Sequence, residues 1–273
     1  MKIFQVALLG LTAFALLSCG ARPTSTSSES EDIRRAYQLI DDDRASDAIV
    51  LLEPRFSANP GRVSLRIALA SAYAARAGLR VPRFADLLVE LIRDGLRGAE
   101  PADRDLDRRL DGLGLDSAQR AHARTVLRDL LAIAELSRRL ERLPHVSEHE
   151  TGDLRKAREL LEPVPNRERG AVLYRAVLAA VDIKYELRSG QFARQFTRRT
   201  DGGCEIQARA VPEAFNVVLE MFELLAADLM IVYPENIGQL RELLAALREL
   251  AGRLERVLEA EELNPRLSWP CSF

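Results

Sequence analysis

The chain has 273 residues, of which 47% are hydrophobic and 5% aromatic, and its formal net charge at pH 7 is −2. This length and composition suffice for a buried core, and the dominance of leucine, alanine and arginine favours helices over sheets. All but three of the 39 basic residues are arginine, and no long basic block is present. The composition therefore excludes the electrostatic footprint of a nucleic-acid-binding protein.

The first residues have the layout of an export signal. Lys2 precedes an apolar run from Ile3 to Leu17, which is short for a membrane-spanning helix and is followed by small residues. We interpret residues 1–18 as a signal peptide. An ordinary signal peptide or anchor with an incidental cysteine is the alternative to the more specific assignment that follows.

The end of the apolar run, Leu16-Leu17-Ser18-Cys19, resembles the lipobox of bacterial lipoproteins. The resemblance implies cleavage before Cys19 and acylation of its thiol, and two or more acyl chains anchor a protein firmly in a membrane. Gly20 follows in place of an aspartate, so the resemblance implies an outer-membrane lipoprotein, most simply on the periplasmic face. Residues 19–31 then form the acylated cysteine and a flexible Ser/Thr-rich linker that spans roughly 15–20 Å.

From residue 32 to residue 273 we expect one all-α domain, because apolar residues recur at three- and four-residue spacing. A first helix stops at the three aspartates 41–43, and a second spans Ala45–Phe56. The turn signal Asn59-Pro60-Gly61 separates it from a third helix over Val63–Ala77, which Gly78 caps.

Positions in these helices resemble the tetratricopeptide (TPR) repeat, and an echo of the second helix follows 109 positions downstream. The matching residues are Ala48, Leu52, Pro60, Leu69, Ala70 and Tyr73, with Ala157 and Leu161 in the echo. The resemblance implies antiparallel helical hairpins stacked as a TPR-like right-handed superhelix. No period of about 34 residues persists, and Pro82 requires an insertion or break near Leu79–Pro82. A generic helical bundle is the alternative.

Further helices are expected over Phe84–Leu96, 103–110, Ser117–Leu143, Arg167–Ser189, Glu213–Val232 and Ile237–Leu263. Glu213–Val232 is apolar on nearly every side, which predicts a buried spine. Ile237–Leu263 carries a heptad pattern that should dock on this spine as an antiparallel hairpin through Tyr233-Pro234. An intermolecular coiled coil is the alternative.

Residues 191–210 break the helical pattern, and FTRRT-DGG-CEIQA predicts a small β-hairpin near residues 196–208, with an unpaired loop as the alternative. Once Cys19 is acylated, Cys204 and Cys271 remain. In an oxidising compartment two such thiols are expected to form a disulfide that joins the hairpin to the C-terminal tail. Free cysteines in a cell without periplasmic oxidation are the alternative.

The segment His145-Val146-Ser147-Glu148-His149 has the H-x-x-E-H pattern of inverted zinc peptidases. Pro144 before it and Gly152 after it leave barely one helical turn, and no third carboxylate ligand can be assigned. Ser147 and Glu150 instead predict a capping box that opens a helix. No Walker loop, nucleotide-binding glycine fingerprint or nucleophile elbow is present. We therefore expect no metal, no cofactor and no enzymatic activity.

Arginines and phenylalanines alternate at one place in the chain, which predicts an exposed cationic and aromatic surface for anionic lipid or an acidic partner. These residues are Phe192, Arg194, Phe196, Arg198 and Arg199. A solvated edge is the alternative.

These features favour a lipid-anchored scaffold or adaptor that binds a protein or peptide partner in the cell envelope. TPR domains that grip peptide C-termini use lysine and asparagine on their inner helices, whereas the corresponding face here, around Ile67, Ser71, Ala74 and Ala75, is small and apolar. This departure argues for a tightly closed superhelix or an apolar ligand groove. The alternative function is an accessory protein whose helices enclose a small molecule or lipid.

Overall fold

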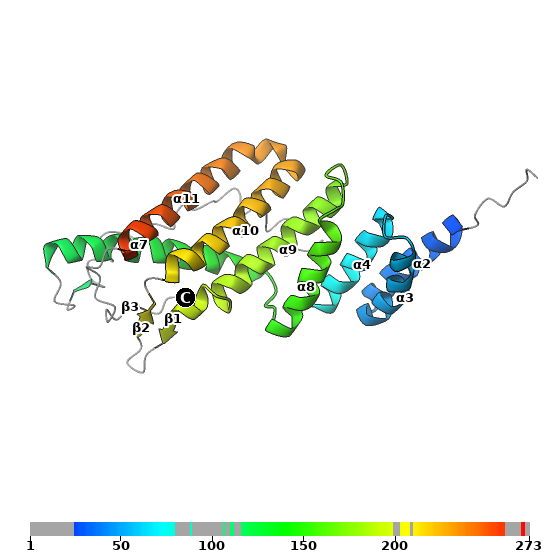
Figure 1. Cartoon of the computed structure of the whole chain (residues 1–273), viewed down its shortest axis with the longest axis horizontal. Helices are drawn as coiled ribbons and strands as arrows, with labels where there is room; N and C mark the ends of the chain where they lie inside the picture. Colours follow the sequence, from blue (N-terminus) through cyan, green and yellow to red (C-terminus); the bar gives the residue numbers. More distant parts are fainter. Residues whose placement is uncertain are drawn as a thin grey trace, which may run out of the picture.

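The computed structural model describes residues 25–79, 88, 106, 110, 111, 116–198, 203–207, 210–259 and 269–270. The described chain is almost entirely helical, which confirms the predicted all-α class. Figure 1 shows an elongated molecule whose helices lie in a row, with α2 and α3 at one end. The helices are α2 (Ser25–Asp41), α3 (Ala45–Ala58), α4 (Val63–Arg76), α7 (Ser117–Arg139), α8 (Glu148–Leu161), α9 (Arg169–Arg188), α10 (Val211–Val232) and α11 (Ile237–Glu259).

The first three helices pack against one another: α2 lies on α3, α3 lies on α4, and α2 also touches α4. Ala36, Ala48 and Leu65 expose no surface and belong to the core of this group. The small side chains of the two alanines let neighbouring helices approach closely, because protein interiors are packed without voids.

The helices α2 and α4 end in the same backbone motif. Asp43 and Gly78 adopt left-handed conformations, with φ angles of 61° and 77°. The amides of the residues that follow them, Arg44 and Leu79, each donate at 2.8 Å to the carbonyl five residues earlier, which is the defining bond of a Schellman motif. The two motifs lie 35 residues apart. α2 and α4 are the first helices of successive hairpins, and both end in the same way.

The helix α4 packs against a helix that lies far along the chain. The described helix that packs on α4 as its partner is α8, although about 70 residues separate Arg76 from Glu148. The break expected near Leu79–Pro82 lies, apart from Leu79 itself, outside the described residues. Of the helices expected over Phe84–Leu96 and 103–110, the structure describes only residues 88, 106 and 110, which are helical and buried. The rest of both lies outside the described residues.

α7 and the short 3-10 helix η2 (Leu140–Arg142) together match the helix expected over Ser117–Leu143. α7 does not join the first hairpins but contacts α11 and α9 at the other end of the row (Figure 1). α7 therefore packs on the C-terminal helices, whereas α8, the next α-helix along the chain, packs on α4.

The C-terminal helices continue the row: α8 lies on α9, α9 on α10 and α10 on α11. α10 and α11 form an antiparallel hairpin through Tyr233 and the 3-10 helix η5 (Pro234–Asn236) (Figure 1). The heptad side chains of α11 are buried within the chain, which confirms the predicted intramolecular docking. They are Leu240, Leu244, Leu247, Ala251 and Leu254.

α10 is buried along one face only, which corrects the predicted spine. Phe215, Val218 and Phe222 expose 1% of their surface or less, whereas Leu224 on the opposite face exposes 59%. α10 packs against α9 and α11, and these neighbours leave its outer face uncovered. No helix within the described ranges, α10 included, combines the length and apolarity needed to cross a bilayer.

A small antiparallel sheet interrupts the helices, which confirms the predicted hairpin. The strand β1 (Phe196–Arg198) pairs with β2 (Gly203–Ile206), with Phe196 opposite Ile206. A third strand, β3 (Trp269–Pro270), pairs with the other edge of β2. The C-terminal tail therefore returns to the hairpin.

α2 begins at Ser25, so part of the linker expected over residues 19–31 is helical. Tertiary contacts explain the difference, because they outweigh the weak helical propensity of a Ser-rich segment. Glu29 accepts a hydrogen bond from the Ser64 hydroxyl at 3.4 Å and lies 3.6 Å from the Arg62 guanidinium. Asp32 pairs with Arg55 of α3 at 2.9 Å.

Candidate functional site

The first hairpin carries a shallow groove between α2 and α3, at the end of the row (Figure 1). Its volume is about 640 Å³, and it is lined by Arg35, Gln38, Leu39, Asp42, Arg44, Asp47, Val50, Leu51, Pro54 and Arg55. Val50 exposes 73% of its surface there. Terminal repeats of stacked-helix proteins usually present a polar outer face, so an exposed valine in a groove indicates a surface that can receive another apolar group.

Polar groups surround Val50. Arg44 and Asp47 pair with each other at 2.7 Å, whereas Arg35 and Asp42 have no ion pair within the described residues. Pro54 lies inside α3 and has no amide hydrogen, so the carbonyl of Val50 receives no helical hydrogen bond. The groove thus offers an apolar centre, charges of both signs and a backbone acceptor.

The expected ligand-facing surface of α4 is largely filled. Its central residues, Ser71 and Ala74, are buried, whereas Ile67 and Ala75 keep partial exposure. This arrangement agrees with the closed alternative at this point of the array.

Tyrosines from two other helices converge on Ser71. The Ser71 hydroxyl donates to the Ile67 carbonyl at 2.9 Å and acts on the pKa of Tyr37 in α2 and of Tyr174 in α9. Burial raises the pKa of Tyr174 to about 12, while the bond to Ser71 acts in the opposite direction.

The residues that carry the repeat resemblance occupy the expected places in the core. Ala48, Leu52, Leu69, Ala70, Tyr73, Ala157 and Leu161 are buried. Pro60 is exposed in the turn between α3 and α4.

Tyr73 also links three helices. Its hydroxyl donates to the Glu53 carboxylate of α3. Burial raises the pKa of Tyr73 to about 12, and the hydrogen bond to Glu53 is the second largest cause of this rise. The Arg76 guanidinium lies 5.2 Å from the centre of the tyrosine ring. Arg76 then binds both carboxylate oxygens of Asp153 in α8, at 2.6 and 2.7 Å. A polar chain thus runs across α3, α4 and α8.

The predicted cationic and aromatic surface is partly wrong. Phe192 exposes no surface, because its ring packs 5.2 Å from Phe196 and 5.9 Å from Phe215 of α10. Arg194 is exposed and lies 3.9 Å from Glu148. Arg198 is described only as part of β1, and Arg199 lies outside the described residues. The aromatic half of the predicted surface is therefore core.

The H-x-x-E-H segment does not form one helical face. α8 begins at Glu148, so His145 precedes the helix while His149 lies in its first turn. Ser147 and Glu150 form the predicted capping box, in which the Ser147 amide donates to the Glu150 carboxylate at 2.7 Å. Within the described ranges, no group of three or more His, Cys, Asp or Glu side chains could hold a metal ion.

The cysteines are only partly described. Cys19 and Cys271 lie outside the described residues, and Cys204 is described by its backbone in β2, opposite Trp269 of β3. Because β3 ends at Pro270, the next residue along the tail is Cys271. The strand pairing brings the backbone of the tail to Cys204, and the disulfide itself stays a prediction.

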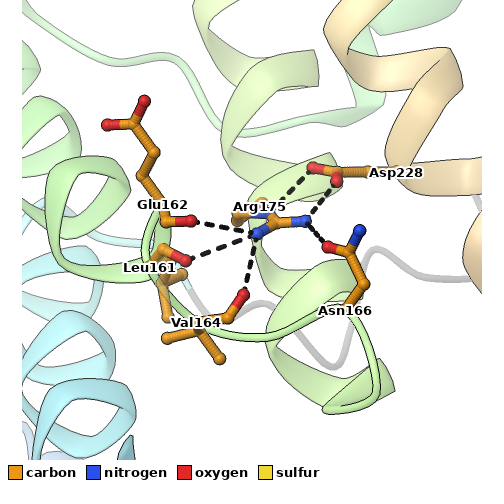
Figure 2. Close-up of polar contacts among 6 residues, drawn as sticks. All are labelled: Leu161, Glu162, Val164, Asn166, Arg175 and Asp228. Atoms are coloured by element: carbon orange, nitrogen blue, oxygen red, sulfur yellow. Dashed lines mark hydrogen bonds and ion pairs between the residues drawn. The ribbon is translucent and has the colours of Figure 1, made fainter. Parts of the chain in front are cut away.

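Arg175 is the main polar junction that sequence reasoning missed. Figure 2 shows its guanidinium between the end of α8 and the side of α10. It donates to both carboxylate oxygens of Asp228, at 2.6 and 3.2 Å, to the Asn166 side chain at 2.9 Å and to the Val164 carbonyl at 3.3 Å. Arg175 and Asp228 expose 14% and 15% of their side chains. The junction satisfies the C-terminal end of α8 and joins three helices.

Burial raises the pKa of Asp228, and the hydrogen bonds and charge of Arg175 lower it. A similar pair joins α7 to α11, because Arg253 binds Asp129, which exposes 3% of its side chain, at 2.9 Å. Lys184 of α9 exposes 6% of its surface and donates to the carbonyls of Glu141 and Leu143 at 3.1 and 2.5 Å. Burial lowers the pKa of Lys184. These buried charges have structural partners.

The fold and the site together define a class: an all-α chain of packed helices with a shallow groove at one end. Comparison with protein-family models, with curated proteins and with solved structures gave no match.

Proposed function

We propose that this chain is a lipid-anchored, TPR-like scaffold of the bacterial cell envelope, and that the groove between α2 and α3 docks a protein partner. The observation that carries the proposal is the groove itself, whose centre exposes 73% of Val50 between charges of both signs. Apolar contact at the centre with a polar rim is the common anatomy of protein interfaces.

The repeat character is supported by the shared ending of α2 and α4 and by the pairing of α4 with α8, which contains the echo residues Ala157 and Leu161. In such arrays each hairpin buries its face on the next, and the surface at the end of the array stays free for another helix.

The anchor places this groove near the membrane. Ser25, the first residue of α2, follows Cys19 by six positions. A chain of that length reaches at most about 20 Å when fully extended. An acylated Cys19 would therefore hold the first hairpin close to the lipid head groups, where an envelope partner could meet the groove.

Crosslinking in living cells tests the docking. A photoreactive amino acid at position 50 should give a discrete adduct with a second protein. The wild-type chain should compete for that partner and reduce the adduct, whereas the Val50→Arg variant should compete poorly. The same amino acid at Ala245, an exposed residue of α11, is the matched control. Adducts that are equally frequent at both positions, or none at position 50, would refute the docking.

Cys19→Ser tests the anchor separately. The wild-type chain should fractionate with membranes and lose its first 18 residues, whereas the variant should keep them. Equal membrane association and equal processing of both chains would refute the lipid anchor without bearing on the groove.

A further inference from the structure

The outer face of α10 carries an apolar ridge that no described helix covers. Val217, Leu224 and Ile231 recur every seven residues, which places them on one side of the helix, opposite the buried Phe215 and Phe222. Leu224, in the middle, exposes 59% of its surface, and Val217 and Ile231 are half-buried. We call these three residues the α10 ridge. A seven-residue repeat of aliphatic side chains is the pattern that pairs one helix with another.

Acidic side chains flank the α10 ridge. Glu213 and Glu220 are exposed on the same side of the helix, and neither has an ion pair within the described part of the chain. α10 contains no basic residue, although arginine and lysine make up 39 of the 273 residues of the chain. The nearest cation of α11, Arg248, is already paired with Glu223 at 2.7 Å. The charged side chains of α10 itself are therefore all acidic, and one of them, Asp228, is paired with Arg175 of α9 at 2.6 Å.

This charge pattern disfavours a second copy of the chain as the occupant. In an antiparallel pair centred on Leu224, no cation of the other copy's α10 would face Glu213 or Glu220, because α10 contains no basic residue. In a parallel pair each glutamate would face its own counterpart. Like charges opposed across a helix pair are destabilising. An anionic lipid surface is disfavoured for the same reason.

We propose that the α10 ridge docks an amphipathic helix of a partner protein, whose apolar stripe is flanked by arginine or lysine. The apolar stripe would cover Val217, Leu224 and Ile231, and the flanking cations would pair with Glu213 and Glu220. This inference deepens the proposed scaffold function and rests on it, but it concerns a surface separate from the groove at Val50.

Designed peptides test the inference on the full-length chain in non-ionic detergent. The probe is a fluorescent 21-residue helical peptide with leucine at the a and d positions of each heptad and arginine at e and g. A matched peptide carries glutamate at e and g. Fluorescence anisotropy should show that the arginine peptide binds at least about tenfold more tightly than the glutamate peptide, and Leu224→Glu should weaken its binding by about tenfold or more.

Charge reversal gives the sharper comparison. Glu220→Arg should weaken the arginine peptide severalfold and strengthen the glutamate peptide, whereas Glu242→Arg, an exposed position of α11, should leave the preference unchanged. All variants should keep the wild-type circular dichroism and melting temperature, because the substituted side chains are exposed.

Equal binding of both peptides, or binding that Leu224→Glu leaves intact, would overturn the inference. A dimer that Leu224→Glu converts to monomer in light scattering would also overturn it and identify the α10 ridge as a self-interface. None of these results bears on crosslinking at Val50, so a failure here is distinct from a failure of the proposed docking groove.

Discussion

Replacing Arg175 by methionine should destabilise the junction between α8, α9 and α10 more than any exposed substitution. The change keeps most of the aliphatic length but removes the guanidinium. It leaves the Asp228 carboxylate, with 15% of its side chain exposed, without its cation. It also deprives the Val164 carbonyl at the end of α8 of its donor.

The magnitude follows from burial. Removing one partner of a fully buried ion pair costs about 3–5 kcal/mol. Because both side chains keep some exposure, we expect about 2–4 kcal/mol for Arg175→Met. The double variant Arg175→Met/Asp228→Leu removes both charges and should lie within about 1 kcal/mol of the wild type. The coupling free energy between the two positions should therefore be about 2 kcal/mol or more.

Urea unfolding followed by circular dichroism at 222 nm measures these differences, with equal m-values required across the series. The pH dependence gives a second check. Burial raises the pKa of Asp228. A carboxyl whose pKa is higher in the folded than in the unfolded state contributes its full stability at a pH below the unfolded-state pKa, and this contribution is lost as the pH rises through the folded-state pKa. Without Arg175 that pKa rises further. The deficit of Arg175→Met should thus shrink as the pH falls from 7 toward 4.

Two results would refute this reasoning. A single variant that loses less than about 1 kcal/mol at pH 7 would mean that Asp228 is adequately solvated without its arginine. A double variant as unstable as the single one would mean that the loss comes from packing or from the end of α8 rather than from the unpaired carboxylate.

Three further predictions concern other parts of the chain. Glu150→Gln keeps a capping-box side chain but removes its charge from the first turn of α8, so it should cost about 0.3–1 kcal/mol at pH 7. Bonds from the hydroxyl and then the amide of the capping serine lower the pKa of Glu150, so the loss should fade as the pH falls below that pKa. Equal losses in melting curves at pH 7 and pH 3.5 would contradict this. Gly190→Ala should cost about 1–3 kcal/mol of stability, because the new Cβ would lie 2.2 Å from the Glu186 carboxylate. Gly152→Ala inside α8 meets nothing within 4 Å and should gain about 0.5–1 kcal/mol. Chemical denaturation should therefore give the first variant a lower and the second a higher free energy of unfolding than the wild type. The thiol of Cys204 should resist alkylation until the protein is reduced, as measured by mass shift, and a thiol that reacts in the unreduced, exported protein would argue against the disulfide.

Local pattern predicted most helices well, because their apolar spacing and stop signals are properties of a few consecutive residues. Gly78 caps α4 as expected, and Ser147 with Glu150 opens α8. The similarity of the segment around Ala157 to the helix over Ala45–Phe56 predicted α8 as a repeat-like helix. The partner of α8, α4, lies about 70 residues earlier, and no local pattern specifies such a pairing.

The errors came from features that depend on neighbours in space. Leu224 and Phe222 are equally apolar in the sequence, and only the positions of α9 and α11 decide that one is exposed and the other buried. The heptad spacing of Leu224 with Val217 and Ile231 was the available signal for the α10 ridge. Arg175 looked like any of the other arginines of solvated helix faces, since nothing in its own segment identifies Asp228 as its partner.

The late arrival of α8 has a kinetic consequence. A three-residue turn joins α2 to α3, whereas about 70 residues separate α4 from α8. By loop-closure entropy, bringing the second pair together costs roughly 3 kcal/mol more than closing the first. At ordinary synthesis rates of about 5–20 residues per second, α8 follows α4 by several seconds. During that interval the face of α4 that α8 will cover stays without α8, so its apolar side chains are available for misassembly while the chain is being made.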